Sequence, residues 1–267
     1  MRGEALYHDP KKGNEARAAL EAAADLFKRV APEDSRYPGA LRDLGSLALD
    51  RSDFAASADY YRQVLAVAAL NRNLTGDTLE ANQGLALALN YEGDVEGAAA
   101  AFQRATYIAV HTYGVKSRKY WMVASDQAEF LYERGERHAA FATFDTLIQS
   151  LPKEKTGFRN ADDALGAALV LRKFGRCLAT DGQGERSIEL LERAQALADR
   201  SAMYPRDSAM LQIDLGSAYQ AGGRIAEASD AFQGAIRILE AQQAPGSWLA
   251  SAHERLGRLR LAEGNSD

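Results

Sequence analysis

Small and bulky apolar positions recur along this chain around a short polar or glycine turn. The turn centres lie 41, 42, 47, 41 and 41 residues apart. They are Ser52, Gly93, Gly135, Gly182, Gly223 and Gly264. Self-similarity with a period of about 20–50 residues is the sequence sign of a repeat architecture. The pattern therefore predicts five complete structural units with an incomplete unit at each end.

The residues after each turn predict a helix. A small residue is followed by a bulky one four positions later and by an apolar or small one three positions after that. These triplets are Ser57, Tyr61, Val64; Ala98, Phe102, Ala105; Ala140, Phe144, Leu147; Ser187, Leu191, Ala194; and Ala228, Phe232, Ala235. Offsets of four and three place all three side chains on one stripe of a helix. The small residue lets a neighbouring helix approach, and the bulky one fills the space beside it.

The residues before each turn predict another helix. A small residue, usually preceded by an apolar one, is followed three positions later by an apolar or aromatic residue in all but the last unit. The pairs are Leu44-Gly45, Leu85-Ala86, Gln127-Ala128, Phe174-Gly175, Leu215-Gly216 and Leu256-Gly257, of which Gln127 departs from the pattern. Each unit is thus expected to be a first helix, a tight turn and a second helix.

This period divides the chain into a single expected solenoid over residues 1–267. A partial unit, 1–35, precedes full units at about 36–75, 76–116, 117–160, 161–205 and 206–244, and a capping helix spans 245–264. Polar side chains are expected to protect the C-terminal end, as terminal repeats usually do. These are Arg255, Arg258, Arg260 and Glu263.

The N-terminal end shows no comparable cap. Counting 41 residues back from the first triplet gives Ala16, Leu20 and Ala23, so 13–30 is predicted to be a second helix. Residues 4–8 then form the tail of a first helix that has no beginning. We expect further repeats or another domain, such as a signalling module, upstream. The alternatives are a frayed first helix and self-association through the uncapped end.

The pattern resembles the tetratricopeptide repeat (TPR) family, most clearly from Leu215 to Ala235 and from Leu85 to Ala105. The family period is about 34 residues, and the longer period here is similar to the variant found in kinesin light chains. The resemblance implies an all-α, right-handed superhelical solenoid of antiparallel helix pairs. It also implies that the first helices line a concave surface that binds a protein or peptide.

The stripe of each first helix opposite its packing stripe supplies the candidate binding residues. They are Arg42, Gln83, Asn90, Tyr91, Met122, Asp126, Glu129, Tyr132, Arg172, Lys173, Arg176, Asp214 and Gln220. Acidic residues in the third unit face basic residues in the fourth, which could orient a peptide of mixed charge. The alternative is that these charges pair with one another across adjacent helices. Tyr120 and Trp121 fit either the core or this surface, because their helical phase is ambiguous.

Composition and motifs argue against catalysis. The net charge is −5, which gives no general attraction for nucleic acid or anionic membranes. Cys177 is the single cysteine, so no internal disulfide forms, and the four histidines lack metal-ligand spacing. The glycine pairs follow no predicted strand, so they are helix ends and not phosphate loops. We therefore predict a cytoplasmic, non-catalytic scaffold that has no cofactor or metal and binds neither nucleic acid nor membrane.

Two alternatives remain open at this point. The scaffold hypothesis competes with a peptide- or ligand-sensing regulatory domain of a longer signalling protein.

The extra residues between the third and fourth units, 152–160, contain proline and glycine and are predicted to be a loop. This loop is either a longer connection without a role or a contact for a partner.

Overall fold

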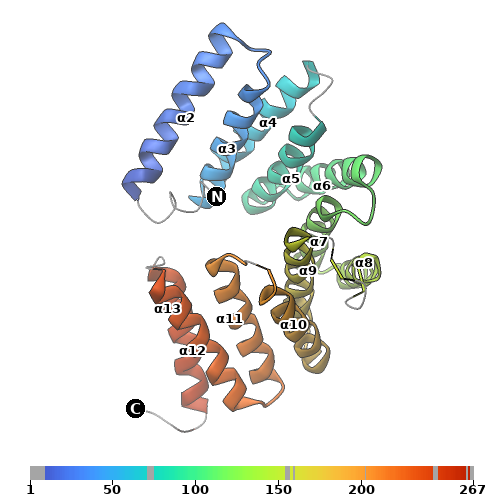
Figure 1. Ribbon diagram of the computed structural model, residues 1–267, viewed down its shortest axis with the longest axis vertical. Coiled ribbons are helices and arrows are strands. Elements are labelled where there is room, and N and C mark those ends of the chain that lie inside the picture. The colour runs from blue at the N-terminus through green and yellow to red at the C-terminus, as the bar shows by residue number, and fades with distance from the viewer. Residues whose placement is uncertain are drawn as a thin grey trace. The chain divides into compact units, whose positions relative to one another are not determined.

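The computed structural model describes residues 10–70, 75–153, 157–158, 160–201, 203–242, 246–262 and 264. Within them the chain forms twelve α-helices and one π-helix and no strand (Figure 1). In chain order they are α2 (Pro10–Val30), α3 (Arg36–Asp50), α4 (Phe54–Leu70), α5 (Thr75–Glu92), α6 (Val95–Ile108), η1 (Ala109–Tyr113), α7 (Arg118–Glu133), α8 (Arg137–Ser150), α9 (Ala161–Thr180), α10 (Gly184–Ala198), α11 (Pro205–Ala221), α12 (Ile225–Ala241) and α13 (Gly246–Ala262). The predicted all-α architecture of helix pairs is confirmed.

The contacts divide the chain into two compact units, Met1–Val115 and Lys116–Asp267. Unit 1 contains α2 to η1, and unit 2 contains α7 to α13. A single solenoid over the whole chain stays a prediction.

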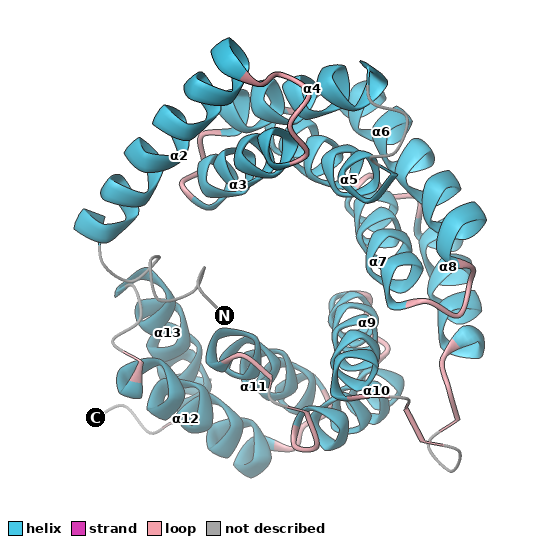
Figure 2. Ribbon diagram, turned by 45° about the horizontal axis from the view of Figure 1, so that its top comes forward, coloured by secondary structure: helices cyan, strands magenta, loops and turns pink. Residues whose placement is uncertain are grey.

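Each unit has two layers of helices. In unit 1, α3 packs on α4 and α5 on α6, while α3 also contacts α5 directly. In unit 2, α7 pairs with α8, α9 with α10 and α11 with α12, while α9 contacts both α7 and α11. Figure 2 shows α3 and α5 in one layer of unit 1 and α2, α4 and α6 in the other. The first helices of each unit thus form a continuous layer with one surface turned away from the second helices.

The recurring turn is a glycine in the left-handed conformation. Gly93, Gly135, Gly182 and Gly223 have φ between 71° and 87°, a region that glycine enters without steric cost. The N–H of the residue after each glycine donates to the carbonyl five positions back, as from Gln183 to Leu178 at 2.9 Å. This is the Schellman pattern that ends a helix while satisfying its last carbonyls. Ser52 makes the first turn with φ 60° in the absence of a glycine.

The predicted packing stripe is buried throughout. All fifteen residues of the five triplets are buried, and so are five of the six small residues that precede the turns. A Cβ built on Gly216 would lie 2.6 Å from the ring of Phe232, and one on Gly175 2.6 Å from Leu191. The small residue of a first helix therefore creates the space that the bulky residue of its second helix fills. Ser57 and Ser187 add matching hydrogen bonds to the carbonyls of Gly45 and Gly175 at 2.8 and 2.7 Å.

The described parts of the first and last helices differ in how their apolar residues are covered. Ala16, Leu20, Ala23 and Phe27 of α2 are only partly buried, and Leu26 and Val30 are 55% and 74% exposed. On α13 the predicted polar cap is exposed at Arg255, Arg258 and Arg260, whereas Ala252, Leu256 and Leu259 face the core. Glu263 and residues 4–8 lie outside the described residues.

The structure places Tyr120 and Trp121 and part of the connection between the third and fourth repeats, whose role stays open. Trp121 is fully buried in the core of unit 2, and Tyr120 packs partly buried against that core. The residues around 152–160 connect α8 to α9, and 154–156 and 159 lie outside the described part. The side chain of Asn160 accepts a hydrogen bond from the N–H of Asp163 at 2.8 Å, which caps α9.

Candidate interaction surface

The first-helix face is defined here as the surface of α3 and α5 in unit 1, and of α7, α9 and α11 in unit 2, that points away from the second helices. It carries the sequence-predicted residues, but the structure brings together only some of them. In unit 2, ion pairs join Asp126, Glu129, Lys173 and Arg176 in one group and Arg172 with Asp214 in a neighbouring pair. Arg42 and Gln83 line a hollow in unit 1.

The group in unit 2 is a ladder of ion pairs across three helices. Lys173 on α9 bonds to Asp126 on α7 and lies 2.6 Å from Glu129, which also pairs with Arg176. On the other side of α9, Arg172 donates to Asp214 on α11 at 3.1 Å. We call these six residues the charge ladder.

Burial and pairing compete in setting the pKa values of the ladder. Burial alone lowers the pKa of Lys173, but Asp126 and Glu129 together outweigh burial and raise it. Burial likewise raises the pKa of Glu129, yet the attraction of Lys173 and Arg176 lowers it overall. At Asp214 burial prevails over Arg172 and raises the pKa. Lys173 and Glu129 are therefore held in their charged forms, while charging Asp214 is opposed.

The ladder corrects one expectation from the sequence. Asp126 and Asp214 were placed on an exposed stripe, but both residues are buried, and only 12% of the Lys173 side chain is exposed. The placement was wrong because the neighbouring first helix covers these positions. The alternative reading, in which the charges pair across adjacent helices, describes the structure. Reversing Arg172, Lys173 and Arg176 together would then disturb stability as well as any binding.

Unit 1 has a different cluster on its first-helix face. Arg42 on α3 lies between carboxylates, with its Nη1 atom 3.2 Å from Asp77 and 3.0 Å from Glu80 on α5. Its Nη2 atom lies 3.3 Å from Asp43. The side chain of Asp43 is 55% exposed, whereas that of Asp126 in the ladder is 9% exposed. Arg42 thus pairs with three carboxylates, at a site that is more exposed to solvent than the charge ladder.

Beside Arg42 the surface of unit 1 is hollowed. The hollow has a volume of about 350 Å³ and lies between α3 and α5. It is lined by Arg42, Ser46, Leu49, Asp50, Tyr61, Glu80, Gln83, Gly84 and Leu87. The Tyr61 hydroxyl and Ser46 Oγ hydrogen-bond at 3.0 Å. The volume falls at the small end of the range of about 300–1,000 Å³ typical of ligand sites.

Several residues of this hollow were not among the candidates. Leu49 and Gly84 were not singled out, and Tyr61 was assigned to the core, where it is buried while also lining the hollow. A Cβ at Gly84 would lie 2.1 Å from the Tyr61 ring, so the missing side chain lets this ring reach between α3 and α5. The sign of this arrangement in the sequence was Gly84, a glycine in α5 at a position where the other first helices carry a charged residue.

The remaining candidates do not join either group. Tyr132 is partly buried and stacks on Phe141, with ring centroids 5.8 Å apart. Tyr91 is 59% exposed and stacks on Phe54 at 4.9 Å near the end of α5. Asn90 and Met122 are partly buried, and Gln220 is exposed. Their role in binding stays a prediction.

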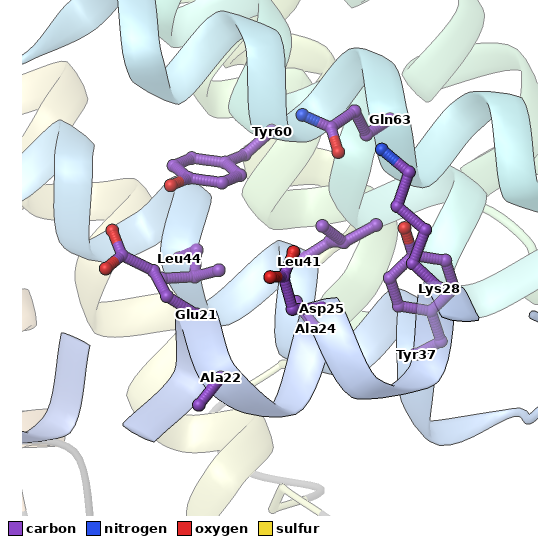
Figure 3. A pocket seen from close by; sticks show the side chains of 10 residues that line it. All are labelled: Glu21, Ala22, Ala24, Asp25, Lys28, Tyr37, Leu41, Leu44, Tyr60 and Gln63. Carbon is purple, nitrogen blue, oxygen red and sulfur yellow. The ribbon is translucent and has the colours of Figure 1, made fainter. Parts of the chain in front are cut away.

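A second hollow in unit 1 lies between α2 and α4 above α3 (Figure 3). Its floor consists of Leu41, Leu44 and Tyr37, and its rim carries Glu21, Asp25 and Lys28. Glu21 pairs with Arg17 at 2.8 Å. The acidic and basic groups around this hollow balance, so its charge selects no class of partner.

The described residues also bear on metal binding and on membrane insertion. Those residues contain no group of three or more His, Cys, Asp or Glu side chains placed to hold a metal ion. None of their helices combines the length and apolarity needed to cross a bilayer. Cys177 is buried, and burial raises the pKa of its thiol to about 12. A thiol of that kind is a structural residue and not a nucleophile.

Comparison with known proteins identifies solved structures that share this architecture. No protein-family model matches the sequence, and no curated protein matches it either. Solved structures do match. BtubC (BKLC) from P. vanneervenii is 20% identical with a TM-score of 0.67, covering 87% of this chain and 93% of that one. The Cut9–Hcn1 hetero-tetramer of APC/C is 15% identical with a TM-score of 0.66, covering 96% of this chain and 41% of that one.

A third similar structure is a putative kinesin light chain from Podosopora anserina with nearly identical TPR-like repeats. It is 18% identical with a TM-score of 0.56, covering 81% of this chain and all of that one. At these identities the likeness shows the fold alone. The chain has the TPR-like fold of an all-α helical repeat solenoid.

Proposed function

We propose that this protein is a non-catalytic interaction scaffold that binds a segment of another protein on its first-helix face. The observation that carries the proposal is the hollow of about 350 Å³ between α3 and α5. It combines apolar surface from Leu49 and Leu87 with charged and hydrogen-bonding groups. Binding sites are usually concave, with apolar walls and a few polar groups that fix orientation.

Within unit 2, ion pairs between neighbouring first helices support a second surface suited to binding. In unit 2 the charge ladder joins α7, α9 and α11 through buried pairs, which hold neighbouring first helices in one register. A scaffold whose elements are held in this way loses little conformational freedom when a partner binds. Repeat solenoids commonly present such extended surfaces to their partners.

The test is to fill the hollow and measure the loss of binding. A partner protein would first be identified by affinity purification with the full chain and then purified. Its dissociation constant would be measured by calorimetry against the native chain, Leu87→Trp and Ala66→Trp. Leu87 lines the hollow, whereas Ala66 is exposed on the second helix α4. We expect Leu87→Trp to weaken binding at least roughly tenfold, the effect of about 1.4 kcal/mol.

The control variant decides the outcome. Ala66→Trp adds the same bulk to a surface outside the first-helix face, so it should change the affinity by less than about twofold. Weakening by Ala66→Trp with unchanged affinity in Leu87→Trp would place the binding surface on the second helices and contradict the proposal. Circular dichroism of both variants would check that the helical fold is retained.

A further inference from the structure

The helix α2 presents an apolar stripe to solvent. Ala19, Ala22, Leu26 and Val30 follow one another at offsets of three and four, so they lie on one side of the helix. All four are exposed, Leu26 by 55% and Val30 by 74%. Ala24, on the opposite side, is buried, and α2 packs on α3 (Figure 1). The helix thus packs on its neighbour with one side and leaves an apolar side uncovered.

The same repeat positions are covered in the other second helices. Ala19 lies one residue before Leu20, the bulky member of its triplet, and Leu26 lies six residues after it. Ala231, the equivalent of Ala19 on α12, belongs to the core that α12 shares with the preceding repeats. The equivalents of Ala19 and Leu26 on the five later second helices are all buried or partly buried: Tyr60 and Val67, Ala101 and Ile108, Thr143 and Ser150, Leu190 and Leu197, and Ala231 and Ile238.

The stripe on α2 is complementary in shape to a second copy of itself. Its first half is small, with Ala19 and Ala22, and its second half is large, with Leu26 and Val30. Two α2 helices that pack in opposite directions about a two-fold axis near Ala22 place the large half of each against the small half of the other. Leu26 then fits against Ala19 of the second copy. Bulky and small residues of paired helices fit together in the same way within each repeat.

The charges at the two ends of the stripe favour the same orientation. Glu15 lies before the stripe and Arg29 at its end, and both are exposed. The Nε–H of Arg29 donates to the carbonyl of Asp25 at 3.3 Å, and neither Glu15 nor Arg29 forms an ion pair within the described part of the chain. Antiparallel packing brings Glu15 of each copy beside Arg29 of the other. Parallel packing would instead bring like charges together.

The helix α13 at the other end of the chain is a poorer match for this stripe. It exposes Leu261 by 65%, but Arg258, Arg260 and Glu254 are exposed on the same helix. Covering these charged groups with alanine and leucine side chains would remove them from water without a new partner. A second copy of α2 offers apolar surface to apolar surface and keeps its charges at the ends.

We propose that this protein forms a two-fold homodimer in which the exposed sides of two α2 helices pack antiparallel. The inference is independent of the proposed function, because α2 belongs to the layer of second helices and leaves the hollow between α3 and α5 accessible (Figure 2). Stable interfaces bury about 1,200–2,000 Å². A contact of one helix from each copy is smaller, so we expect a weak dimer with a Kd of about 10–100 μM. The dimer would present two copies of the hollow to a partner.

The first test measures the association of the full chain by sedimentation equilibrium. The native chain, Leu26→Asp and Leu261→Asp would be compared from about 1 μM to about 1 mM, which brackets the expected Kd. Leu26 and Leu261 are both exposed leucines on helices, so either substitution should leave the fold intact, as circular dichroism would check. We expect Leu26→Asp to raise the dimer Kd at least about tenfold and Leu261→Asp to change it less than about twofold, since each dimer contains Leu26 twice.

The second test exchanges the charges at the ends of the stripe. Glu15→Arg alone and Arg29→Glu alone each place like charges together at both ends of the dimer contact, which should raise the Kd about threefold or more. The combined variant restores opposite charges and should return the Kd to within about twofold of the native value. A mere structural defect in α2 would not be rescued in this way. Added salt should reduce the difference between the single and combined variants.

Four outcomes would overturn the inference. A native chain that stays monomeric up to about 1 mM would reject self-association at any meaningful affinity. Species that keep growing beyond the dimer would show a head-to-tail contact and reject the two-fold axis. A loss in Leu261→Asp as large as in Leu26→Asp would place α13 in the contact. Failure of the combined charge variant to recover would reject the antiparallel orientation. The proposed function would stand in each case, because none of these substitutions alters a residue that lines the hollow.

Discussion

The first-helix faces of the two units differ in how their carboxylates are paired with basic residues. In unit 2, α7, α9 and α11 carry seven carboxylates and six basic residues, and the central ones pair within the ladder. In unit 1, α3 and α5 carry five carboxylates and two arginines, and a hollow lies between these two helices. The carboxylate side chains of the ladder are 9–15% exposed, whereas those that pair with Arg42 are 20–55% exposed.

This difference has an energetic consequence. A buried ion pair gains strongly from its partner but leaves a costly unpaired charge when that partner is removed. An exposed pair is screened by water and contributes little. Removing one charged side chain of a pair should therefore lower the stability of unit 2, whereas in unit 1 it should mainly weaken the binding of a partner.

The largest effect is expected from reversing the basic side of the ladder. Replacing Arg172, Lys173 and Arg176 together with Glu would place three carboxylates against Asp126, Glu129 and Asp214. We expect unit 2 to lose its fold, because unpairing even one buried ion pair costs about 3–5 kcal/mol. Hydrogen exchange followed by mass spectrometry should show lost protection in α7, α9 and α11. Full protection of these helices would contradict the ladder as a buried network.

A single substitution compares the two units directly. Lys173→Met leaves two buried carboxylates without their ammonium group and should destabilise by about 3–5 kcal/mol. Arg42→Met removes a partly exposed cation and should cost about 1 kcal/mol or less. Urea denaturation monitored by circular dichroism gives both values. Equal losses of unfolding free energy in the two variants would show that the ion pairs of the two faces do not differ in their contribution to stability.

Gly84 tests the packing beneath the hollow. In Gly84→Ala the new methyl group would meet the Tyr61 ring, which lies 2.1 Å from its ideal position. We expect a loss of about 1–3 kcal/mol, the usual cost of overpacking. Gly39→Ala in α3 is the matched control, since a Cβ there meets no atom within 4 Å. A larger loss in the control would show that helix geometry, and not the Tyr61 contact, governs the effect.

The smallest effect concerns acid titration of the ladder. The lowered pKa of Glu129 stabilises the folded state above the unfolded pKa of this residue, and that stability is lost as pH falls through the folded pKa. The raised pKa of Asp214 acts with the opposite sign, because its contribution is present at low pH and lost as pH rises through the folded pKa.

Two variants separate these opposing contributions. Between pH 6 and about pH 3, near the carboxylate range, Glu129→Gln should flatten the loss of stability on acidification, and Asp214→Asn should steepen it. Urea midpoints measured across this range check both slopes. Slopes that change in the same direction in the two variants would contradict the assignment.

The helix pairs were predictable because their cause is local. The spacing of Ser187, Leu191 and Ala194 needs only a helix to define a packing stripe, and Gly182 needs only its own φ to end one. The charge ladder was not predictable in the same way. A wheel of α9 alone shows Lys173 on the side away from the core, and only the position of α7 shows that this side is covered.

The hollow could not be predicted from the sequence for a related reason. Tyr61 matches the core position filled by Phe102 and Phe232 in other repeats, so the pattern assigns it to packing and does not reveal the hydrogen bond of its hydroxyl to Ser46. Asp77, which pairs with Arg42, lies in the first turn of α5, outside the stripe from which the candidates were taken. Such residues become visible only when two first helices are placed side by side.

The sealed environment of Cys177 makes this side chain an intrinsic probe of α9. A thiol whose pKa is raised to about 12 is almost entirely protonated at neutral pH, and protonated thiols do not react with alkylating reagents. Because the chain contains one cysteine, every alkylation event records a moment when α9 leaves its neighbours. The labelling rate of the native protein would thus time the opening of this helix without any engineered tag.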